Sequence, residues 1–166
     1  MPNEEVEDSL TRLIEDMNHL GLSTQTKNRL HNLPALIDAV DLESVQELFN
    51  DVLNECLTPD TKVFNYEPDI RNILYMKIPE QKLTKLREHK TLHGESDLEL
   101  KTHKTHLVIE FKRTYEDRDV DASLLEGIRQ IKTKEYGKGT SALTLVRVVM
   151  VCDTKERKIV LTQRVD

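Results

Sequence analysis

Two runs of alternating apolar and polar residues flank a short polar gap between Gly94 and Arg113. This pattern predicts a β-hairpin, because successive side chains of a strand point to opposite faces of a sheet. If His103 and Lys104 form the tight loop, the antiparallel register follows directly. The expected pairs are Thr102 with Thr105, Leu100 with Leu107, Leu98 with Ile109, and Asp97 with Glu110.

The two faces of this hairpin differ in chemistry, since directly opposed residues point to the same side. One face is apolar and is expected to contact the core; it carries Leu98, Leu100, Leu107, Ile109 and Phe111. The opposite face carries Asp97, Glu99, Val108, Glu110 and Lys112. Carboxylates and one ammonium group therefore share a small area whose reverse side is apolar.

Carboxylates that lie this close repel and raise one another's pKa unless a cation sits between them. Hard divalent cations such as Mg²⁺ bind carboxylate oxygens and keep open positions for water and phosphate. A lysine beside such an ion can orient or deprotonate water, or offset charge that builds on a phosphorane-like transition state. The polar face of the hairpin therefore suits metal-assisted hydrolysis of a phosphodiester bond.

Asp97, followed at hairpin distance by the triplet from Glu110 to Lys112, resembles the signature of the PD-(D/E)XK nuclease superfamily. Within that superfamily the chain is most similar to the nuclease-like domain at the C-terminal end of bacterial AAA-ATPase-like proteins. The resemblance covers about residues 63–162. It includes a helix that carries Gln130 and, six residues later, Tyr136.

The resemblance implies an α/β fold with a mixed β-sheet flanked by helices, and Mg²⁺- or Mn²⁺-dependent hydrolysis of nucleic acid, with DNA favoured over RNA. The metal ligands that it implies are Glu67, Asp97, Glu110 and the backbone carbonyl of Phe111. Lys112 would position or activate water, while Gln130 and Tyr136 would shape the substrate side. Glu67 has an equal alternative as a helix-start acid that the macrodipole stabilises by about 0.3–1 kcal/mol. Ser96 replaces the nominal proline of the signature, a departure that the superfamily tolerates.

An acid, any residue and a lysine occur in this order at six other places, as expected where 33% of residues are charged. These triplets begin at Asp60, Glu80, Glu88, Glu99, Asp153 and Glu156. Glu110 differs from them because it lies in the apolar run His106–Phe111 and is opposed by Asp97. Three alternatives stay open: a solvated strand face, a catalytically weak nuclease-fold binding module, and an effector or toxin module that acts through protein or nucleic-acid contacts.

Charge is spread unevenly along the chain, whose net charge is −6. Residues 1–80 carry −10 and residues 81–166 carry +4, so the half that contains the motif suits a polyanionic substrate. No apolar run approaches a membrane span, and the acidic N-terminus is unlike a signal peptide. Cys56 and Cys152 lack metal-ligand spacing, which favours a cytoplasmic protein with reduced thiols; a secreted effector stays open.

We divide the chain into an acidic helical segment at residues 1–60 and a nuclease-like domain at residues 61–166. Helices are expected in the first segment at residues 4–20, 24–33, 34–40 and 42–56. Asp41 is the expected N-cap of the last of these. Their apolar faces either complete the core of the domain, or bind a protein partner or a second copy of the chain.

In the second segment, proline at position 68 favours a helix that begins at Glu67. Residues 80–90 are basic and are interpreted as loosely helical, with Leu83 and Leu86 inward. Ser123 is the expected cap of a helix whose inner stripe is Leu124, Leu125, Ile128, Ile131 and Tyr136. Strands are expected at residues 62–66, at 143–152, where both faces are buried, and at 158–162.

Overall fold

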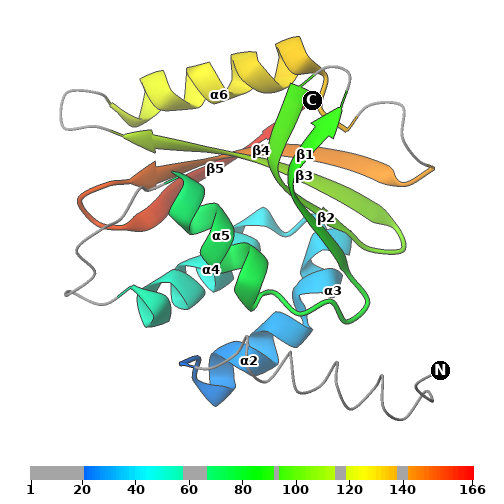
Figure 1. Cartoon of the computed structure of the whole chain (residues 1–166), viewed down its shortest axis with the longest axis vertical. Coiled ribbons are helices and arrows are strands. Elements are labelled where there is room, and N and C mark those ends of the chain that lie inside the picture. The colour runs from blue at the N-terminus through cyan, green and yellow to red at the C-terminus, as the bar shows by residue number, and fades with distance from the viewer. Residues whose placement is uncertain (1–20, 58–66, 92–93, 115–118, 138–141) are drawn as a thin grey trace.

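A five-stranded mixed β-sheet lies at the centre of the computed structural model, which describes residues 21–57, 67–91, 94–114, 119–137 and 142–166 (Figure 1). The strands are β1 (Thr84–Thr91), β2 (Gly94–Lys101), β3 (Thr105–Thr114), β4 (Thr144–Asp153) and β5 (Lys158–Val165). They lie in chain order across the sheet. β3 and β4 are parallel, and the other neighbouring pairs are antiparallel. The expected mixed-sheet α/β fold is therefore confirmed.

Helices cover both faces of this sheet (Figure 1). Their bounds are α2 (Thr24–His31), α3 (Leu33–Asp38), α4 (Leu42–Cys56), α5 (Glu67–Lys77) and α6 (Val120–Lys134). α6 connects the parallel strands β3 and β4 and packs on one face, whereas α3, α4 and α5 pack on the other. A helical crossover is the usual way to join two parallel strands. No helix in the described part of the chain is long and apolar enough to span a bilayer.

The hairpin has the predicted register from its loop to Leu98, which pairs with Ile109. Thr102 closes the loop, because its backbone N–H donates to the Thr105 carbonyl at 2.9 Å. The Thr102 hydroxyl oxygen also accepts the backbone N–H groups of Lys104 and Thr105, at 3.1 and 2.9 Å. A threonine that satisfies turn amides in this way favours a short loop at this point.

The sheet separates two hydrophobic clusters, as a sheet covered by helices on both faces requires. The larger cluster joins α2–α5 to the sheet face that carries Leu98, Ile109 and Phe111. The smaller cluster lies under α6 and includes Val108 and Val149. β4 contributes to both clusters and is buried from residue 146 to 152, so the predicted strand with two buried faces is confirmed.

Polar side chains attach α4 to the edge strand β5. Asn50 donates to the Ile159 carbonyl and accepts from its N–H, both at 2.8 Å, and Gln46 reaches the same carbonyl at 3.3 Å. Asp41 accepts the Ser44 N–H, so the predicted cap of α4 is confirmed. Because α2–α4 share one buried cluster with the sheet, their apolar faces are used inside this chain.

The prediction of a loose helix at residues 80–90 was wrong, because most of this segment forms β1 beside β2. Lys85 explains the error, since it is buried although its charge suggested a solvated position. Its ammonium group donates to the carbonyls of Tyr75 and Ile78, at 2.6 and 2.8 Å, at the C-terminus of α5. Cations are favoured there by the helix dipole, but the partner helix is invisible in local sequence.

The predicted start of α6 was also wrong. Asp119 is the N-cap and accepts the Ala122 N–H at 2.7 Å, whereas Ser123 is buried and donates to the Arg113 carbonyl at 3.0 Å. Leu125, placed on the inner stripe, is 65% exposed. The other members of the predicted stripe, Leu124, Ile128, Ile131 and Tyr136, pack in the smaller cluster, and Gly127 allows close contact with Val149 on β4.

The last strand is longer than expected and continues to Val165. The helix predicted to begin at Glu67 is confirmed as α5. The helix expected at residues 4–20 and the strand expected at residues 62–66 fall outside the described residues.

Gly127→Ala should destabilise the protein by about 1–3 kcal/mol, because overpacking exceeds the gain of about 1 kcal/mol in helix propensity. A Cβ at this position would lie 2.5 Å from Val149 Cγ1 and 3.1 Å from Lys112 Cγ. Urea unfolding measures the effect, with the exposed Arg129→Ala on the same helix as control. Equal stability of Gly127→Ala and the parent would show that α6 is not held this close to the sheet.

Candidate active site

Asp97 lies where the hairpin strands stop pairing. The β2–β3 register ends at Leu98 and Ile109, and beyond it the Asp97 Oδ2 atom accepts the Phe111 backbone N–H at 2.8 Å. The expected backbone pairing of Asp97 with Glu110 is thus replaced by a side-chain contact to the next residue. Burial raises the pKa of Asp97, while the Phe111 N–H and the charge of Arg71 act in the opposite direction.

Glu110 is the least satisfied carboxylate in the described part of the chain. It is 2% exposed; its Oε1 atom lies 3.2 Å from the Lys112 ammonium, and its Oε2 atom is buried without a hydrogen-bond partner among the described residues. Burial and the charge of Asp97 raise the pKa of Glu110 to about 8, although Lys112 opposes this shift. A buried oxygen without a hydrogen-bond partner destabilises the folded state by about 1–3 kcal/mol. A partner for this Glu110 oxygen would therefore stabilise the protein.

Lys112 connects the carboxylates to α6. Its Nζ atom donates to Gln130 Oε1 at 2.7 Å, and Gln130 Nε2 in turn donates to the Tyr136 hydroxyl at 3.1 Å. Burial raises the pKa of Tyr136, and the charge of Glu110 adds to this effect. Glu126, one turn before Gln130, lies 3.9 Å from the same ammonium group. Two side chains of α6 therefore help to hold the Lys112 ammonium group in place.

Glu67 reaches the site from the first residue of α5. Its Oε1 atom accepts the Arg113 backbone N–H at 2.9 Å, next to Lys112 on β3. Its charge raises the pKa values of Asp97 and Glu110, which shows that it lies close to both. All residues predicted for the site converge on one region from α5, β2, β3, α6 and the turn after α6: Glu67, Asp97, Glu110, Phe111, Lys112, Gln130 and Tyr136. Tyr136 was expected on the helix but lies beyond its end at Lys134.

The donor atoms at this site fit a hard divalent cation. Carboxylate and carbonyl oxygens are the ligands that Mg²⁺ and Mn²⁺ prefer, and the orphaned oxygen of Glu110 offers one directly. Within the described residues, no three His, Cys, Asp or Glu side chains form a group suited to a metal ion. Glu67 and Asp97 each accept a backbone N–H through one carboxylate oxygen, so the unpartnered oxygen of Glu110 is the donor on which the fit chiefly rests.

Glu99 was predicted to lie on the same face as Glu110, but its pKa is shifted in the opposite direction. The Ser96 hydroxyl donates to it at 2.6 Å, and ring nitrogens of His106 and His89 lie 2.7 and 3.0 Å from its oxygens. Burial would raise the pKa of Glu99, but these three hydrogen bonds outweigh burial and lower it to about 2. Glu99 therefore has all its partners within the protein, whereas Glu110 does not.

Sequence reasoning missed Arg71 at this site. Its Nη1 atom lies 3.5 Å from Asp97 Oδ1, and its Nη2 atom lies 2.9 Å from Glu88 Oε1. Arg71 follows Glu67 by four residues on α5, and residues with this spacing share one face of a helix. That spacing was the available signal for Arg71.

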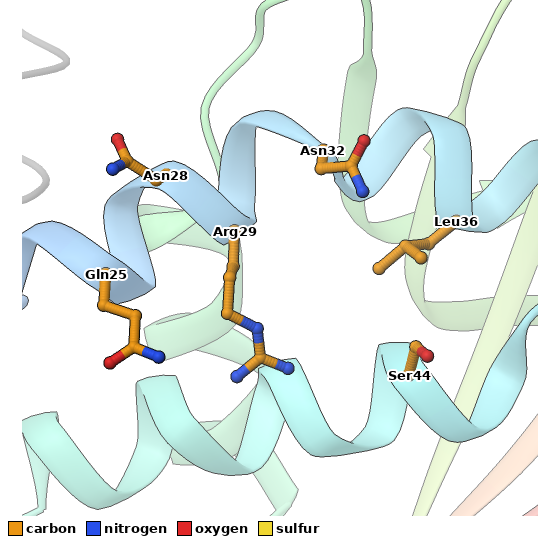
Figure 2. Close-up of a pocket in the computed structure, with 6 residues that line it drawn as sticks. All are labelled: Gln25, Asn28, Arg29, Asn32, Leu36 and Ser44. Atoms are coloured by element: carbon orange, nitrogen blue, oxygen red, sulfur yellow. The ribbon is translucent and has the colours of Figure 1, made fainter.

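A hollow lies elsewhere, between α2, α3 and α4 (Figure 2). Its volume is about 620 Å³, and it is lined by Gln25, Asn28, Arg29, Asn32, Leu36 and Ser44. The guanidinium group of Arg29 forms an ion pair with Asp51 on α4. None of the site residues lines this hollow, and it contains no carboxylate lining residue. The candidate active site is therefore identified by the carboxylates and the lysine that meet there, and not by the presence of this hollow.

Comparison with known protein families agrees with the motif. A family model described as the PD-(D/E)XK nuclease superfamily matches residues 65–161, which is more than half of the chain. The match extends from just before α5 into β5 and so includes every residue of the candidate site. The match identifies the superfamily and carries no information on whether the domain belongs to an AAA-ATPase-like protein. No curated protein and no solved structure matches the chain significantly.

Proposed function

Because the chain belongs to the PD-(D/E)XK nuclease superfamily, we propose that it is a divalent-metal-dependent nuclease that hydrolyses phosphodiester bonds, with DNA favoured over RNA. The observation that carries this proposal is the buried Glu110, whose Oε2 atom has no partner among the described residues and whose neighbour Asp97 is also acidic. Structural carboxylates in protein interiors are normally satisfied, as Glu99 is.

Asp97, Glu110 and the Phe111 carbonyl would hold Mg²⁺ or Mn²⁺. When bound there, the ion would supply Lewis acidity and lower the pKa of a water molecule near the phosphate. The residues present favour this occupancy, because a cation offsets the repulsion that raises the pKa of Glu110. Glu67 would assist the metal from the start of α5, where its Oε1 atom also accepts the Arg113 N–H.

Lys112 would orient the attacking water or offset charge on the phosphate as the bond breaks. Its ammonium group is already held by Gln130 and Glu110, so little ordering remains to be done during the reaction. Gln130 accepts a hydrogen bond from this ammonium group and donates one to the Tyr136 hydroxyl. Gln130 and Tyr136 would form the side of the site that contacts the substrate. The proposed roles therefore use contacts that exist before substrate binds.

Nucleic acid is the expected partner because exposed positive charge lies near the site. Arg129, Lys132 and Lys134 are exposed on the C-terminal half of α6, close in sequence to Gln130 and Tyr136. Residues 81–166 also carry a net charge of +4, in contrast to the acidic first half. Phosphate contacts by such residues supply sequence-independent affinity for polyanions.

The direct test incubates the purified protein with supercoiled plasmid, linear DNA and RNA in Mg²⁺, in Mn²⁺ and in chelator. We expect metal-dependent cleavage that stops with chelator and is faster on DNA than on RNA. Glu43→Gln, a change on α4 remote from the site, is the control for purification and contamination. Binding of nucleic acid without cleavage would instead support the catalytically weak binding module.

Mg²⁺ should also raise the melting temperature of the protein, because a ligand that binds only the folded state stabilises it. At a concentration about 100 times its Kd, the ion adds about 2.7 kcal/mol, or roughly 5–10 °C for a domain of this size. Glu110→Gln should abolish this shift. Differential scanning fluorimetry at pH 8 measures it, and an equal shift in both proteins would place the ion elsewhere.

A further inference from the structure

Arg71 joins two acidic groups at the edge of the candidate active site. Its side chain is 13% exposed, and its guanidinium group lies between Asp97 on β2 and Glu88 on β1. The contact to Glu88 is 2.9 Å and the contact to Asp97 is 3.5 Å, so Asp97 is the looser of the two partners. Arg71 is therefore a cation held beside a proposed metal ligand.

Part of the hydrogen-bonding capacity of Arg71 is unused. Three buried side-chain atoms in the described residues have no hydrogen-bond partner, and two of them are Arg71 Nε and Glu110 Oε2. The two atoms belong to one electrostatically linked group, since Asp97 interacts with Arg71 and with Glu110. A donor and an acceptor left unsatisfied in the same site indicate that the site lacks ligand atoms of both charges.

Glu88 is held in a backbone conformation that L residues rarely adopt. Its φ angle is 48°, in the left-handed region, and the β1–β2 register passes over it from Arg87 to His89. Such a conformation is strained and persists where surrounding structure enforces it. From this position the Glu88 carboxylate contacts Arg71 Nη2, so the guanidinium group is anchored through a different nitrogen from the one that faces Asp97.

We propose that Arg71, anchored by Glu88, is the residue that binds a substrate phosphate next to the scissile bond. This inference rests on the proposed nuclease function. When Asp97 holds a divalent cation, its charge is neutralised, and the guanidinium group loses its attraction to that carboxylate. Arg71 then presents its planar fork, including the Nε–H group, to a phosphate, which it can bind through two hydrogen bonds.

The test measures binding of a fluorescent DNA duplex by anisotropy over a range of salt concentrations, in Ca²⁺ and in chelator, with gel analysis to confirm intact DNA. In Ca²⁺, Arg71→Gln should weaken binding about 10-fold, as expected for one charge-assisted contact. The slope of log affinity against log salt should fall by about 0.9. In chelator, the variant and the parent should bind alike, because Arg71 then stays on Asp97.

Two further variants separate phosphate binding from a structural role. Arg71→Lys should keep the salt slope but recover only part of the affinity, because lysine is a point charge without the fork. It also keeps the charge beside Asp97, which preserves the fold if Arg71→Gln unfolds. Arg87→Gln is the matched control, since Arg87 lies between the same helix and strand but directs its guanidinium group to Asn72 and the Tyr75 ring.

An unchanged affinity and salt slope for Arg71→Gln in Ca²⁺ would overturn the proposal, as would an equal loss for Arg87→Gln. The outcome is distinguishable from failure of the nuclease function. If the protein does not cleave in Mg²⁺ but its binding depends on Arg71 as described, the phosphate contact stands and the proposed activity falls. If it cleaves, and Arg71→Gln cleaves with the same KM, the activity stands and the phosphate contact falls.

Discussion

Glu110→Gln should abolish metal-dependent cleavage and, at alkaline pH, make the protein more stable than the parent. The two effects have one physical cause. Burial and the nearby Asp97 make ionised Glu110 costly in the folded protein, and a cation is the partner that would remove this cost. A neutral amide of the same shape removes both the metal ligand and the cost of burying a charged group.

The pH dependence of this effect follows from linkage. Glu110 has a pKa of about 8 when folded and about 4.5 when unfolded, so the folded state binds more protons between these values. Its contribution to stability is therefore unaffected below about pH 4.5, decreases as pH rises through this window, and reaches its full penalty above about pH 8. We expect Glu110→Gln to gain about 1–2 kcal/mol at pH 8.5, partly offset by loss of the Lys112 ion pair.

Urea unfolding of both proteins at pH 5, 7 and 8.5, in chelator, measures the gain. Glu99→Gln is the matched control, because the pKa of Glu99 is lowered to about 2 and its shift has the opposite sign. Ionised Glu99 stabilises the fold above about pH 4.5 and loses this effect as pH falls toward 2, so Glu99→Gln should be destabilised at neutral pH. If Glu110→Gln were destabilised equally at pH 8.5, Glu110 would be a satisfied structural carboxylate.

Lys112→Met should lower the rate of cleavage by about 10²–10⁴-fold while leaving the fold intact. Methionine keeps the length of the apolar stem, which packs closely at Gly127, and removes the charge. Alanine is a poorer choice, because the Lys112 side chain is 12% exposed and its apolar stem also fills space under α6.

Single-turnover cleavage of plasmid in Mg²⁺ measures this loss, and circular dichroism at pH 7 checks the fold. Lys132→Met, an exposed change on α6, controls for loss of general positive charge. Its effect should be confined to DNA affinity, which falls modestly with one phosphate contact. Cleavage by Lys112→Met at the parental rate would remove Lys112 from the mechanism.

The parts of the fold that could be predicted were those with a strong local pattern. The hairpin register follows from alternating residues on both sides of a tight loop, since a slip of one residue would turn Leu98 and Leu100 out of the core. β4 was recognisable because a continuous apolar run can only be buried on both faces. The Asp41 cap follows from a local hydrogen bond to Ser44.

The errors arose where distant partners satisfy a charge or set a close approach. β1 was mistaken for a helix because Lys85 is satisfied by α5 carbonyls, which compensate for its burial. The N-terminus of α6 was misplaced because Ser123 and Asp119 are both good caps, and the Arg113 carbonyl on β3 takes the Ser123 hydroxyl. Leu125 was placed inward because a helical stripe allows more than one rotation of the helix.

The sequence by itself determined which side chains share a face of the hairpin, because the period of a strand is two and the loop is short. Only the tertiary structure decided how those side chains differ. Glu99 and Glu110 have the same chemistry and the same predicted face, but Ser96, His89 and His106 surround one of them with hydrogen bonds. The other is buried beside Asp97 with an oxygen that lacks a partner among the described residues, because its surroundings bring only one lysine, Lys112 on β3, together with further acids, Asp97 on β2 and Glu67 on α5.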